Sequence, residues 1–203
     1  MDKLFYERKW IDNGCKYVAG VDEVGRGPLA GPVVCCAVIM PLDDIIDGVE
    51  DSKKLSEKKR ESLAKLIKEK AIAYCIYQVL QEEIDRINIL EAVKVCMTRA
   101  VEGLNVKPDI TLVDGVDTNL PINAEYVIKG DANSYTIGCA SIVAKVFRDN
   151  LMCEYAKEYP EYAFEKHKGY GTKVHIDKIK EIGPCPLHRR TFIKNFWGTQ
   201  EKN

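Results

Sequence analysis

The sequence predicts an α/β fold, and three features of the chain lead to this expectation. Short apolar runs rich in β-forming residues recur along the chain, and longer segments with apolar residues at helical spacing lie between them. The stretch from Val18 to Met40 joins two of these runs through glycines and prolines. With 203 residues the chain can form one domain of roughly 150 residues plus an appendage. We therefore expect a single α/β body, without repeats, low-complexity tracts or long linkers.

The stretch from Val18 to Met40 predicts a strand, an irregular turn and a second strand. The first strand ends in Asp22 and Glu23, and successive side chains of a strand project to opposite faces. One acid could thus point into a cleft beside the sheet while the other reaches the same site from the strand edge. A carboxylate in so apolar a stretch is costly to desolvate unless a positive group neutralises it. From the residues alone, a solvated acidic pair is an equally good interpretation.

The glycines of this turn allow a second interpretation. Residues 25–30, Gly-Arg-Gly-Pro-Leu-Ala, match one form of the dinucleotide-binding fingerprint. That fingerprint needs a helix to follow, so that the helix N-terminus meets the pyrophosphate, whereas Pro32 opens a β-rich run. We therefore expect the glycines to let another backbone or a ligand approach closely, with Arg26 as a donor to a phosphate or hydroxyl group.

The elements around this stretch follow from local patterns. Each expected helix carries its apolar residues on one stripe, which is typical of a face buried in a core. Before residue 105 we expect, in order, one or two helical turns in residues 1–17, a helix capped by Ser56, a strand at 71–80, an acidic turn, and a helix from Ile89 to about Gly103.

Two further short strands are each followed by an acid. The apolar run Ile110–Val113 ends on Asp114, and a short strand at 126–128 leads to Asp131. The segment 134–155 predicts a helix whose first half, being small and apolar, must pack closely against another element. On its polar side lie Lys145, Arg148 and Asp149, where we expect an ion pair with the body.

The character of the chain changes after Pro160. Tyr170 lies between glycines beside basic residues, a helix is expected at about 173–182, and a short aromatic helix ends the chain. We divide the chain into a catalytic domain at 1–157 and a C-terminal helical extension at 158–203 that packs on the same domain.

Composition limits the classes of function. The chain is 46% hydrophobic and 30% charged with a net charge of −1, so no global positive field attracts nucleic acid, and a polyanion site must come from local clustering. The first residues lack the apolar core of a signal peptide, and the run Val33–Met40 is far shorter than the roughly 20 residues that span a bilayer. We expect a cytoplasmic monomer with no membrane partner.

Eight cysteines occur without any Cys-x-x-Cys pair, and several lie inside apolar periodic stretches. This pattern indicates small core residues in a reducing compartment, and it argues against a zinc site or a disulfide framework.

Four carboxylates end or follow predicted strands: Asp22, Glu23, Asp114 and Asp131. If those strands are neighbours, the acids converge, and like charges at close range cannot all stay ionised without cations. Hard oxygen ligands without nearby His or Cys suit Mg²⁺ or Mn²⁺. Two such ions about 4 Å apart are a standard arrangement for in-line phosphodiester cleavage.

Several motifs in order along the chain resemble the bacterial ribonuclease HII family. They are residues 20–33 (GVDEVGRGPLAGPV), 112–115 (LVDG), 129–131 (KGD), 140–149 (ASIVAKVFRD) and 167–172 (HKGYGT), and the resemblance runs from about residue 16 to 194. It implies a ribonuclease H-like fold, with a mixed sheet, helices on both faces and a C-terminal helical extension.

The resemblance also implies an activity. The family's enzymes are metal-dependent endonucleases that hydrolyse the RNA strand of RNA–DNA hybrids and incise duplex DNA 5′ of embedded ribonucleotides. Two Mn²⁺ or Mg²⁺ ions take part, and the products carry 3′-hydroxyl and 5′-phosphate ends. The partners implied are therefore RNA–DNA hybrids and ribonucleotide-containing duplex DNA.

By motif position, the resemblance assigns roles to individual residues. The four acids correspond to the metal-binding carboxylates, Gly25, Arg26 and Gly27 to the motif that recognises ribose 2′-hydroxyls, and Tyr170 to the tyrosine that stacks on the next deoxyribose. Only the 2′-hydroxyl separates RNA from DNA at a given sugar, so a closely approaching Gly-Arg-Gly backbone is a reasonable reader. Four further residues could hold phosphates: Lys53, Lys54, Ser141 and Lys145. Lysines beside loops, however, often only face solvent.

Three alternatives can be weighed against this interpretation. The related type HIII enzymes carry an extra N-terminal domain and a different glycine motif, whereas here the lead before Asp22 is short and Gly-Arg-Gly is intact. A silent hybrid-binding module would keep Arg26 and Tyr170 but lose an acid, and none is missing. A dinucleotide enzyme would need a helix after Gly27.

Overall fold

A mixed sheet forms the centre of the computed structural model, which describes residues 2–49, 52 and 55–197. In this part of the chain the strands are β1 (Val18–Val24), β2 (Val33–Ile39), β3 (Ala73–Val79), β4 (Ile110–Asp114) and β5 (Ala124–Val127), in the order β3-β2-β1-β4-β5. β2 pairs antiparallel with β1 and β3, whereas β4 runs parallel to both β1 and β5. The strands predicted from the sequence are all present.

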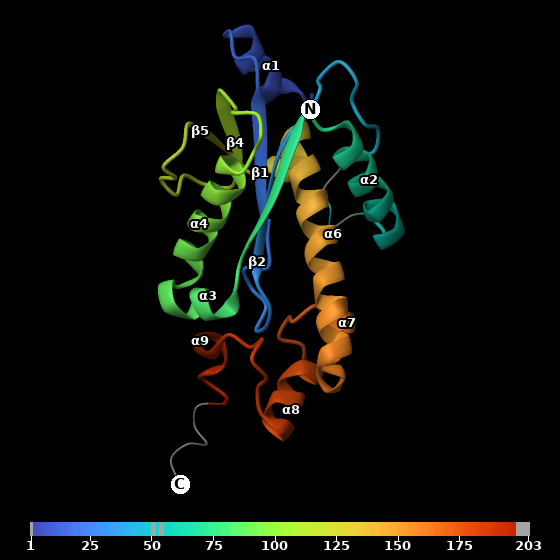
Figure 1. The fold of residues 1–203 in the computed structure, drawn as a ribbon, viewed down its shortest axis with the longest axis vertical. Coiled ribbons are helices and arrows are strands. Elements are labelled where there is room, and N and C mark those ends of the chain that lie inside the picture. Colours follow the sequence, from blue (N-terminus) through green and yellow to red (C-terminus); the bar gives the residue numbers. More distant parts are fainter. Residues whose placement is uncertain (1, 50–51, 53–54, 198–203) are drawn as a thin grey trace.

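Helices cover both faces of the sheet. Figure 1 shows α4 on one side, and α2 and α6 on the other. The helices of the described residues are α1 (Phe5–Asp12), α2 (Glu57–Lys70), α3 (Gln81–Ile87), α4 (Ile89–Glu102), α5 (Gly130–Asn133), α6 (Tyr135–Glu158), the 3₁₀ turn η1 (Pro160–Tyr162), α7 (Phe164–His167), α8 (Lys173–Ile182) and α9 (Arg190–Ile193). This arrangement confirms the α/β class, with helices on both faces of a mixed sheet.

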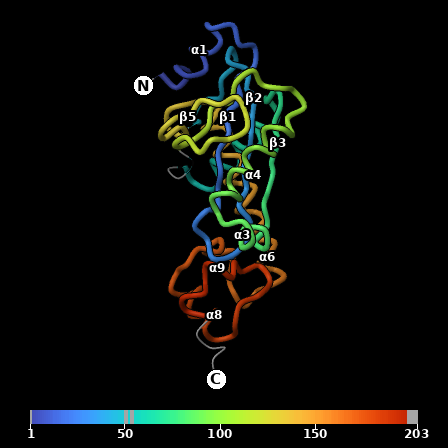
Figure 2. Tube along the Cα trace, turned by 90° about the vertical axis from the view of Figure 1, so that its left-hand side faces the viewer, coloured from blue at the N-terminus to red at the C-terminus, as the bar shows by residue number. Residues whose placement is uncertain are grey.

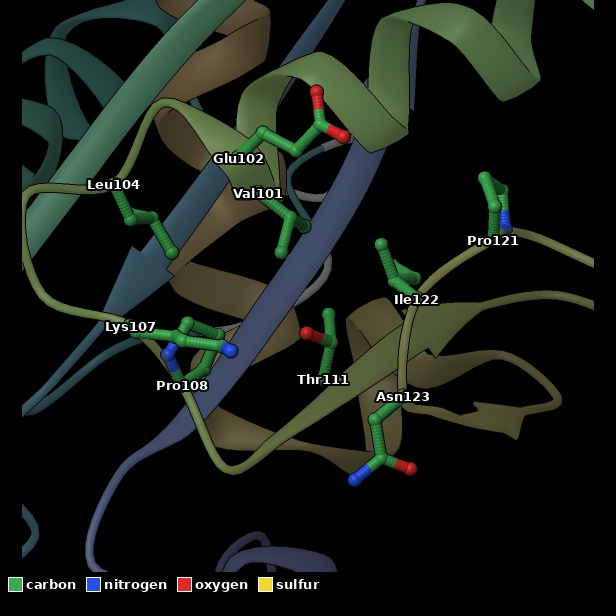
Figure 3. Close-up of a pocket in the computed structure, with 9 residues that line it drawn as sticks. All are labelled: Val101, Glu102, Leu104, Lys107, Pro108, Thr111, Pro121, Ile122 and Asn123. Carbon is green, nitrogen blue, oxygen red and sulfur yellow. The ribbon is translucent and has the colours of Figure 1, made fainter.

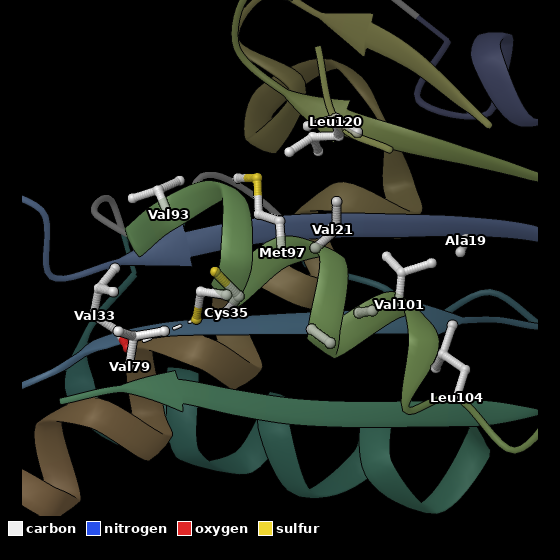
Figure 4. Close-up of a cluster of buried hydrophobic side chains, with 14 of the residues drawn as sticks. Ala19, Val21, Val33, Cys35, Val79, Val93, Met97, Val101, Leu104 and Leu120 are labelled. Carbon is white, nitrogen blue, oxygen red and sulfur yellow. Dashed lines mark hydrogen bonds between the residues drawn. The ribbon is translucent and has the colours of Figure 1, made fainter. Parts of the chain in front are cut away.

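β2 shows how one strand serves two cores. All seven of its residues are buried, because the strand is central and covered on both sides. Val33 and Cys35 belong to the core beneath α4, drawn in Figure 4, whereas Val34 and Cys36 belong to the core formed with α2 and α6. All eight cysteines of the chain are free, and five of them are buried, as a role in core packing predicts.

A close approach between β1 and α6 sets the position of the site. A Cβ atom on Gly20 would lie 2.3 Å from the carbonyl carbon of Thr136, so only glycine permits this contact. The start of α6 therefore lies directly against β1, two residues before the strand's acids. This contact confirms that the small, apolar first half of α6 packs closely against another element.

The N-terminal helix also fixes the start of α6. One carboxylate oxygen of Glu7, Oε1, accepts hydrogen bonds from the Ser134 hydroxyl (2.6 Å) and from the Thr136 amide (2.9 Å). A carboxylate at a helix N-terminus interacts favourably with the helix dipole. The prediction that residues 1–17 contain a helix is confirmed, and α1 is joined to the body through this contact.

One local prediction needs correction. The expected acidic turn after β3 is the helix α3, which buries Gln81 and Ile84 and is separated from α4 by Asn88 at a φ of 69°. Asp131 follows the strand β5, as predicted, and lies in the first turn of the short helix α5. The Ser56 cap is confirmed, since its hydroxyl accepts from the Lys59 amide.

The long helix α6 connects the body to the C-terminal segment. Figures 1 and 2 both show the chain from η1 onward gathered at one end of the long axis, around and beyond the last turns of α6. There Met152 of α6 and Ala30 of the turn between β1 and β2 share a core with Phe164, Ile179 and Leu187. The C-terminal segment therefore packs against the glycine-rich turn that carries Arg26.

Candidate active site

Asp22 and Asp114 lie at the same edge of the sheet because β1 and β4 are parallel neighbours. Their pairing runs as far as Val21 opposite Val113, and each acid is the next residue along its strand. The carboxyl ends of adjacent parallel strands are a common place for binding sites in α/β folds. The convergence of these two acids, expected from the sequence only if the strands were neighbours, is confirmed.

A cavity of about 280 Å³ opens at this edge. Glu23 borders it beside Asp22, one residue before β1 ends at Val24. Asp22 is only 5% exposed, and its Oδ1 accepts from the Glu23 amide at 2.7 Å. The residues that line the cavity are Asp22, Glu23, Val24, Ser52, Asp114, Ser141, Lys145 and Tyr170.

The carboxylates in this cavity are held close enough to disturb one another. Burial raises the pKa of Asp22 well above its usual value, and the charges of Glu23 and Asp114 raise it further, while a hydrogen bond from Ser141 partly offsets this. Burial also raises the pKa of Glu23, and nearby Arg26, whose Nη1 lies 3.3 Å from Oε1, counteracts that shift. The cavity therefore concentrates negative charge that a bound cation would stabilise.

Asp131 lies beside this cluster on α5. Its amide is 3.4 Å from Asp114 Oδ1, and the Gly130 amide donates to the same oxygen at 2.6 Å. α5 therefore holds the Asp114 carboxylate through backbone donors, and Asp131 is not among the residues that line the cavity. Of the four acids expected to converge, three line the cavity, and Asp131 lies at its margin.

The lysines proposed for phosphate contact fall into two groups. Lys145 borders the cavity, and its Nζ lies 2.7 Å from Asp149 Oδ1, one turn further along α6. Asp149 also lies 3.9 Å from Arg60 of α2, which is the ion pair with the body that the sequence predicted. Lys53 and Lys54 are outside the described residues.

The glycine turn, residues 25–31 between β1 and β2, lies next to the segment that carries Tyr170, and Tyr170 lines the cavity. Gly25 has a φ of 97°, and a Cβ atom there would lie 2.4 Å from Arg148 Nε, so the position excludes other residues. Arg26 and Gly27 are exposed at the surface of the turn. A Cβ atom on Gly27 would lie 3.8 Å from Cε1 of Tyr170, a residue that is 41% exposed, and the Leu29 amide donates to the Gly169 carbonyl at 2.8 Å. The two segments that the sequence singled out, 143 positions apart, are in contact.

Two buried arginines hold this turn, and the sequence analysis missed the role of both. Arg189 is fully buried and donates to the carbonyl oxygens of Gly25 (2.6 Å), Arg26 (2.9 Å) and Gly31 (2.8 and 3.0 Å). Arg148, also fully buried, donates to the carbonyls of Pro32 (2.9 Å) and Ala30 (3.1 Å), and to that of Lys168 (3.0 Å). The expectation that Arg148 lies on the polar side of its helix is wrong, because the side chain is buried against these carbonyls. Burial lowers the pKa of Arg148 to about 10 and that of Arg189 to about 9, so both remain charged at neutral pH.

Ser52 is a further residue of the site that the sequence did not reveal. Its hydroxyl lies 3.0 Å from that of Ser141, and both side chains are buried at the cavity. The Ser52 carbonyl accepts from Arg60 at 3.1 Å, which ties this loop to α2. Only its place beside Lys53 and Lys54 in the sequence could have drawn attention to it.

The donor set fits divalent cations whose coordination is completed from outside the protein. Carboxylate oxygens are the ligands that Mg²⁺ and Mn²⁺ prefer, and Mg²⁺ commonly takes one or two carboxylates together with water and substrate phosphate oxygens. Across residues 2–49, 52 and 55–197, no group of three or more His, Cys, Asp or Glu side chains is arranged to hold an ion by itself. The residues therefore suit a shared protein–phosphate site better than a closed protein cage.

A larger cavity, of about 570 Å³, lies near the beginning of β4, away from these acids. Figure 3 shows its lining, in which Val101 and Ile122 supply apolar surface and Lys107 and Glu102 are charged. It has neither paired carboxylates nor the glycine turn. The smaller, acidic cavity is therefore the candidate active site.

Known proteins resemble the chain over nearly its whole length. Residues 19–200 match a family model described as Ribonuclease HII. The Ribonuclease HII of Clostridium perfringens strain SM101 is 54% identical over 195 residues, covering 94% of this chain and 71% of that protein. That of Caldicellulosiruptor bescii is 52% identical over 190 residues, covering 93% and 92%.

A solved structure extends the likeness to three dimensions. The crystal structure of ribonuclease H2 from Pyrococcus horikoshii OT3 is 28% identical in sequence, with a TM-score of 0.78, covering 92% of this chain and all of that one. The expected ribonuclease H-like fold is thereby confirmed. Within the described residues, no helix combines the length and apolar character that crossing a membrane requires.

Proposed function

The chain belongs to the ribonuclease HII family, and from this premise we propose how it selects and cuts its substrate. As a ribonuclease H it is a hydrolase of the RNA strand in RNA–DNA hybrids. We propose that it also incises duplex DNA on the 5′ side of an embedded ribonucleotide, leaving 3′-hydroxyl and 5′-phosphate ends.

One observation carries this proposal. The acidic cavity between the ends of β1 and β4 is bordered by Tyr170, and the carbonyl of the preceding residue, Gly169, accepts from the Leu29 amide of the glycine turn at 2.8 Å. A phosphodiester bound at the acids would therefore have its neighbouring sugars against the turn and the tyrosine. Cleavage chemistry and recognition of the sugar are side by side.

We assign the reading of the ribose to Gly25, Arg26 and Gly27. The Gly25 and Arg26 carbonyls accept from Arg189, whereas Arg26 and Gly27 are exposed. The Arg26 guanidinium, 3.3 Å from Glu23, is therefore at the surface beside the acids, where a ligand can reach it. A ribose 2′-hydroxyl offers a donor and an acceptor that deoxyribose lacks. This turn would favour cutting beside a ribonucleotide.

We assign the reading of the following sugar to Tyr170. Its exposed ring can lie flat on a deoxyribose, where a 2′-hydroxyl would crowd it. The enzyme would then sense an RNA-to-DNA junction and not the ribose alone.

Asp22, Glu23, Asp114 and Asp131 are proposed to hold two divalent ions, Mg²⁺ or Mn²⁺. When bound, such ions activate the attacking water and stabilise the leaving oxygen. The raised pKa values of Asp22 and Glu23 support this assignment, because a nearby cation lowers the cost of keeping both ionised. Asp114 is oriented for the same purpose by the Gly130 amide.

Ser141, Lys145 and Lys53 are proposed to contact phosphates. Lys145 borders the cavity, and its pairing with Asp149 would orient its ammonium group toward a backbone phosphate next to the cut. The Ser141 hydroxyl at the cavity wall, which bonds Asp22 and Ser52, could donate to a phosphate oxygen in place of Asp22.

The test is a labelled duplex that contains a single ribonucleotide, incubated with Mg²⁺, with Mn²⁺ or with excess EDTA. We expect one cut on the 5′ side of the ribonucleotide in either metal, and an inert all-DNA duplex of the same sequence. Cleavage in EDTA would refute the metal assignment. Cleavage on the 3′ side, or cutting of uniform hybrid alone, would refute the proposed selection of single ribonucleotides.

A further inference from the structure

The chain contains three histidines, and all of them lie in one cluster behind Tyr170. The rings of His167 and His175 are stacked with centroids 4.4 Å apart, and His175 Nε2 lies 3.0 Å from His188 Nε2. His175 is fully buried and His188 is 2% exposed. None of the three borders the acidic cavity, so the proposed chemistry does not use them directly.

The backbone determines which nitrogen of each ring carries hydrogen. His188 Nδ1 lies 3.0 Å from the Cys185 amide, 3.2 Å from the Cys185 thiol and 3.3 Å from the Cys185 carbonyl oxygen. The amide hydrogen points at Nδ1 and makes the shortest of these contacts, so Nδ1 accepts and a neutral His188 carries its hydrogen on Nε2. His188 Nε2 then donates to His175 Nε2, which leaves the hydrogen of His175 on Nδ1. That nitrogen lies 2.9 Å from the carbonyl oxygen of Tyr170, which can only accept.

The same assignment results when the chain of bonds is followed from the other end. The Tyr170 carbonyl requires a hydrogen on His175 Nδ1, so His175 Nε2 is an acceptor and His188 must donate to it. Two independent backbone groups therefore impose one direction on the series Cys185 to His188 to His175 to Tyr170.

His167 holds the preceding residue. Its Nδ1 accepts from the Gly169 amide at 3.2 Å, so its Nε2 carries the hydrogen and donates to the Tyr162 carbonyl at 2.9 Å. Gly169 and Tyr170 are thus bonded to two different rings. The Gly169 carbonyl in turn accepts from the Leu29 amide of the glycine turn at 2.8 Å.

The series requires neutral rings. Protonation of His175 at Nε2 would place two N–H groups against each other at the 3.0 Å contact between the rings. Protonation of His188 at Nδ1 would set its new N–H against the Cys185 amide, which is also 3.0 Å away. Burial lowers the pKa of His175 to about 4 and that of His188 to about 3, so both are neutral at pH 7. The charged or titratable groups that face the cluster are Tyr162, Glu165, Lys168, Cys185 and Arg190.

We propose that His188 and His175 form a hydrogen-bond relay that positions Tyr170, and so sets how sharply the enzyme prefers an RNA-to-DNA junction. This inference rests on the proposed reading of the deoxyribose by Tyr170. His175 and His188 are positioning residues, since they act through the Tyr170 carbonyl and not on the substrate.

Two substitutions of His175 separate positioning from packing. His175→Asn keeps a donor near the place of Nδ1 and can still bond the Tyr170 carbonyl, whereas His175→Gln reaches toward His188 and loses that donor. Gln is the larger side chain, so if His175 only fills space, the Gln variant should be closer to the wild type in substrate preference. If His175 positions Tyr170, the Asn variant should be the closer one. The comparison of the two variants therefore decides between packing and positioning.

The measured quantity is kcat/KM on a single-ribonucleotide duplex divided by kcat/KM on a uniform RNA–DNA hybrid. We expect His175→Gln to lower this ratio by about 3- to 10-fold, the effect of one lost hydrogen bond, in the same direction as Tyr170→Ala. His175→Asn should keep the ratio within about 2-fold of the wild type. Equal ratios for Asn and Gln, or a better ratio for Gln, would overturn the relay as a positioning device.

A second measurement does not depend on activity. With three histidines, ¹⁵N-histidine labelling of the full chain gives three imidazole spin systems whose tautomers can be read at pH 7. We expect His175 with hydrogen on Nδ1, and His167 and His188 with hydrogen on Nε2. Any other tautomer of His175 or His188, or an imidazolium form of either, would overturn the relay.

Failure of the relay and failure of the proposed function give different results. If Tyr170→Ala leaves the ratio unchanged, the proposed role of Tyr170 is wrong, and with it the positioning role of the histidines. If Tyr170→Ala lowers the ratio while the Asn and Gln variants behave alike, the role of Tyr170 stands and only the relay is refuted.

Discussion

At the scale of single residues, Asp22 shows how a fold can bring negative charges together around one buried carboxylate. It is buried at the end of a central strand, next to Glu23 and close to Asp114, and its pKa is raised by burial and by both neighbours. Such an arrangement of carboxylates destabilises the folded protein but favours the binding of cations. Carboxyl groups with strongly shifted pKa values in a cleft are typical of functional sites, so the arrangement indicates a functional role for Asp22.

We predict that Asp22→Asn and Asp114→Asn each lower cleavage by at least about 100-fold, because losing a metal-binding charge weakens transition-state stabilisation more than substrate binding. Asp117→Asn is the matched control, since Asp117 is exposed, three residues beyond Asp114. The measurements are kcat and hybrid affinity in Mg²⁺. Near wild-type rates for both site variants would contradict the assignment.

Removing the Asp22 charge should also stabilise the protein in EDTA. Because the folded-state pKa of Asp22 lies above its unfolded value, the ionised group opposes folding, and stability is lost as pH rises through that raised pKa. Asp22→Asn removes this loss, so we expect its melting temperature at pH 7 to be above that of the wild type, with the difference shrinking near pH 4. Adding Mg²⁺ should raise the wild type more than the variant.

For Asp131 we expect a weaker dependence. It lies on α5 at the margin of the cavity, so Asp131→Asn should reduce activity in a way that higher metal concentration partly restores. Titration of activity with Mn²⁺ measures this. A defect that is the same at every metal concentration would indicate that Asp131 only supports α5.

At the scale of elements, the turn between β1 and β2 depends on the C-terminal segment. Its carbonyls at Gly25, Arg26 and Gly31 all accept from Arg189, and Ala30 forms a bridge with His188. A turn with so few backbone bonds of its own would otherwise be free to move. The conformation that carries Arg26 is therefore imposed from a distance.

We predict that Arg189→Lys lowers stability by about 2–4 kcal/mol and reduces discrimination between ribose and deoxyribose. Lysine keeps the charge but cannot donate in the planar, forked geometry of a guanidinium, so buried carbonyls lose their partners. The adjacent Arg190 is exposed, so Arg190→Lys is the control and should leave both properties unchanged. Denaturant unfolding and rates on ribose- and deoxyribose-containing duplexes measure the two effects.

At the scale of the whole molecule, we propose that residues 1–157 and 158–203 unfold together. Met152 and Ala30 of the first part share a core with Phe164 and Ile179 of the second. Both buried arginines also bond across the boundary, since Arg148 donates to the Lys168 carbonyl and Arg189 to the Gly31 carbonyl. We expect one calorimetric transition with equal calorimetric and van't Hoff enthalpies. Two separable transitions would mean that the extension is an independent unit.

Local patterns in the sequence determined much of this structure. Alternation and helical spacing identified the strands, the buried stripe of α4 and the close packing of α6, because those periods report which side chains must leave water. The position of Asp22 and Asp114 after apolar strands pointed to an acidic site. The Ser56 cap was equally local, since it bonds an amide three residues away.

Only the tertiary structure decided how the charged residues are used. The sequence predicts that Arg148 lies on the polar side of a helix. The side chain is instead buried, and it donates to the carbonyl oxygen of Ala30, 118 positions earlier. Arg189 reaches Arg26 across 163 positions, and the three histidines meet only once α7, α8 and the segment after α8 are folded together. Spacing along a chain reports which surfaces are apolar. Which partner satisfies a buried donor is fixed by distant segments, and so no local pattern could reveal it.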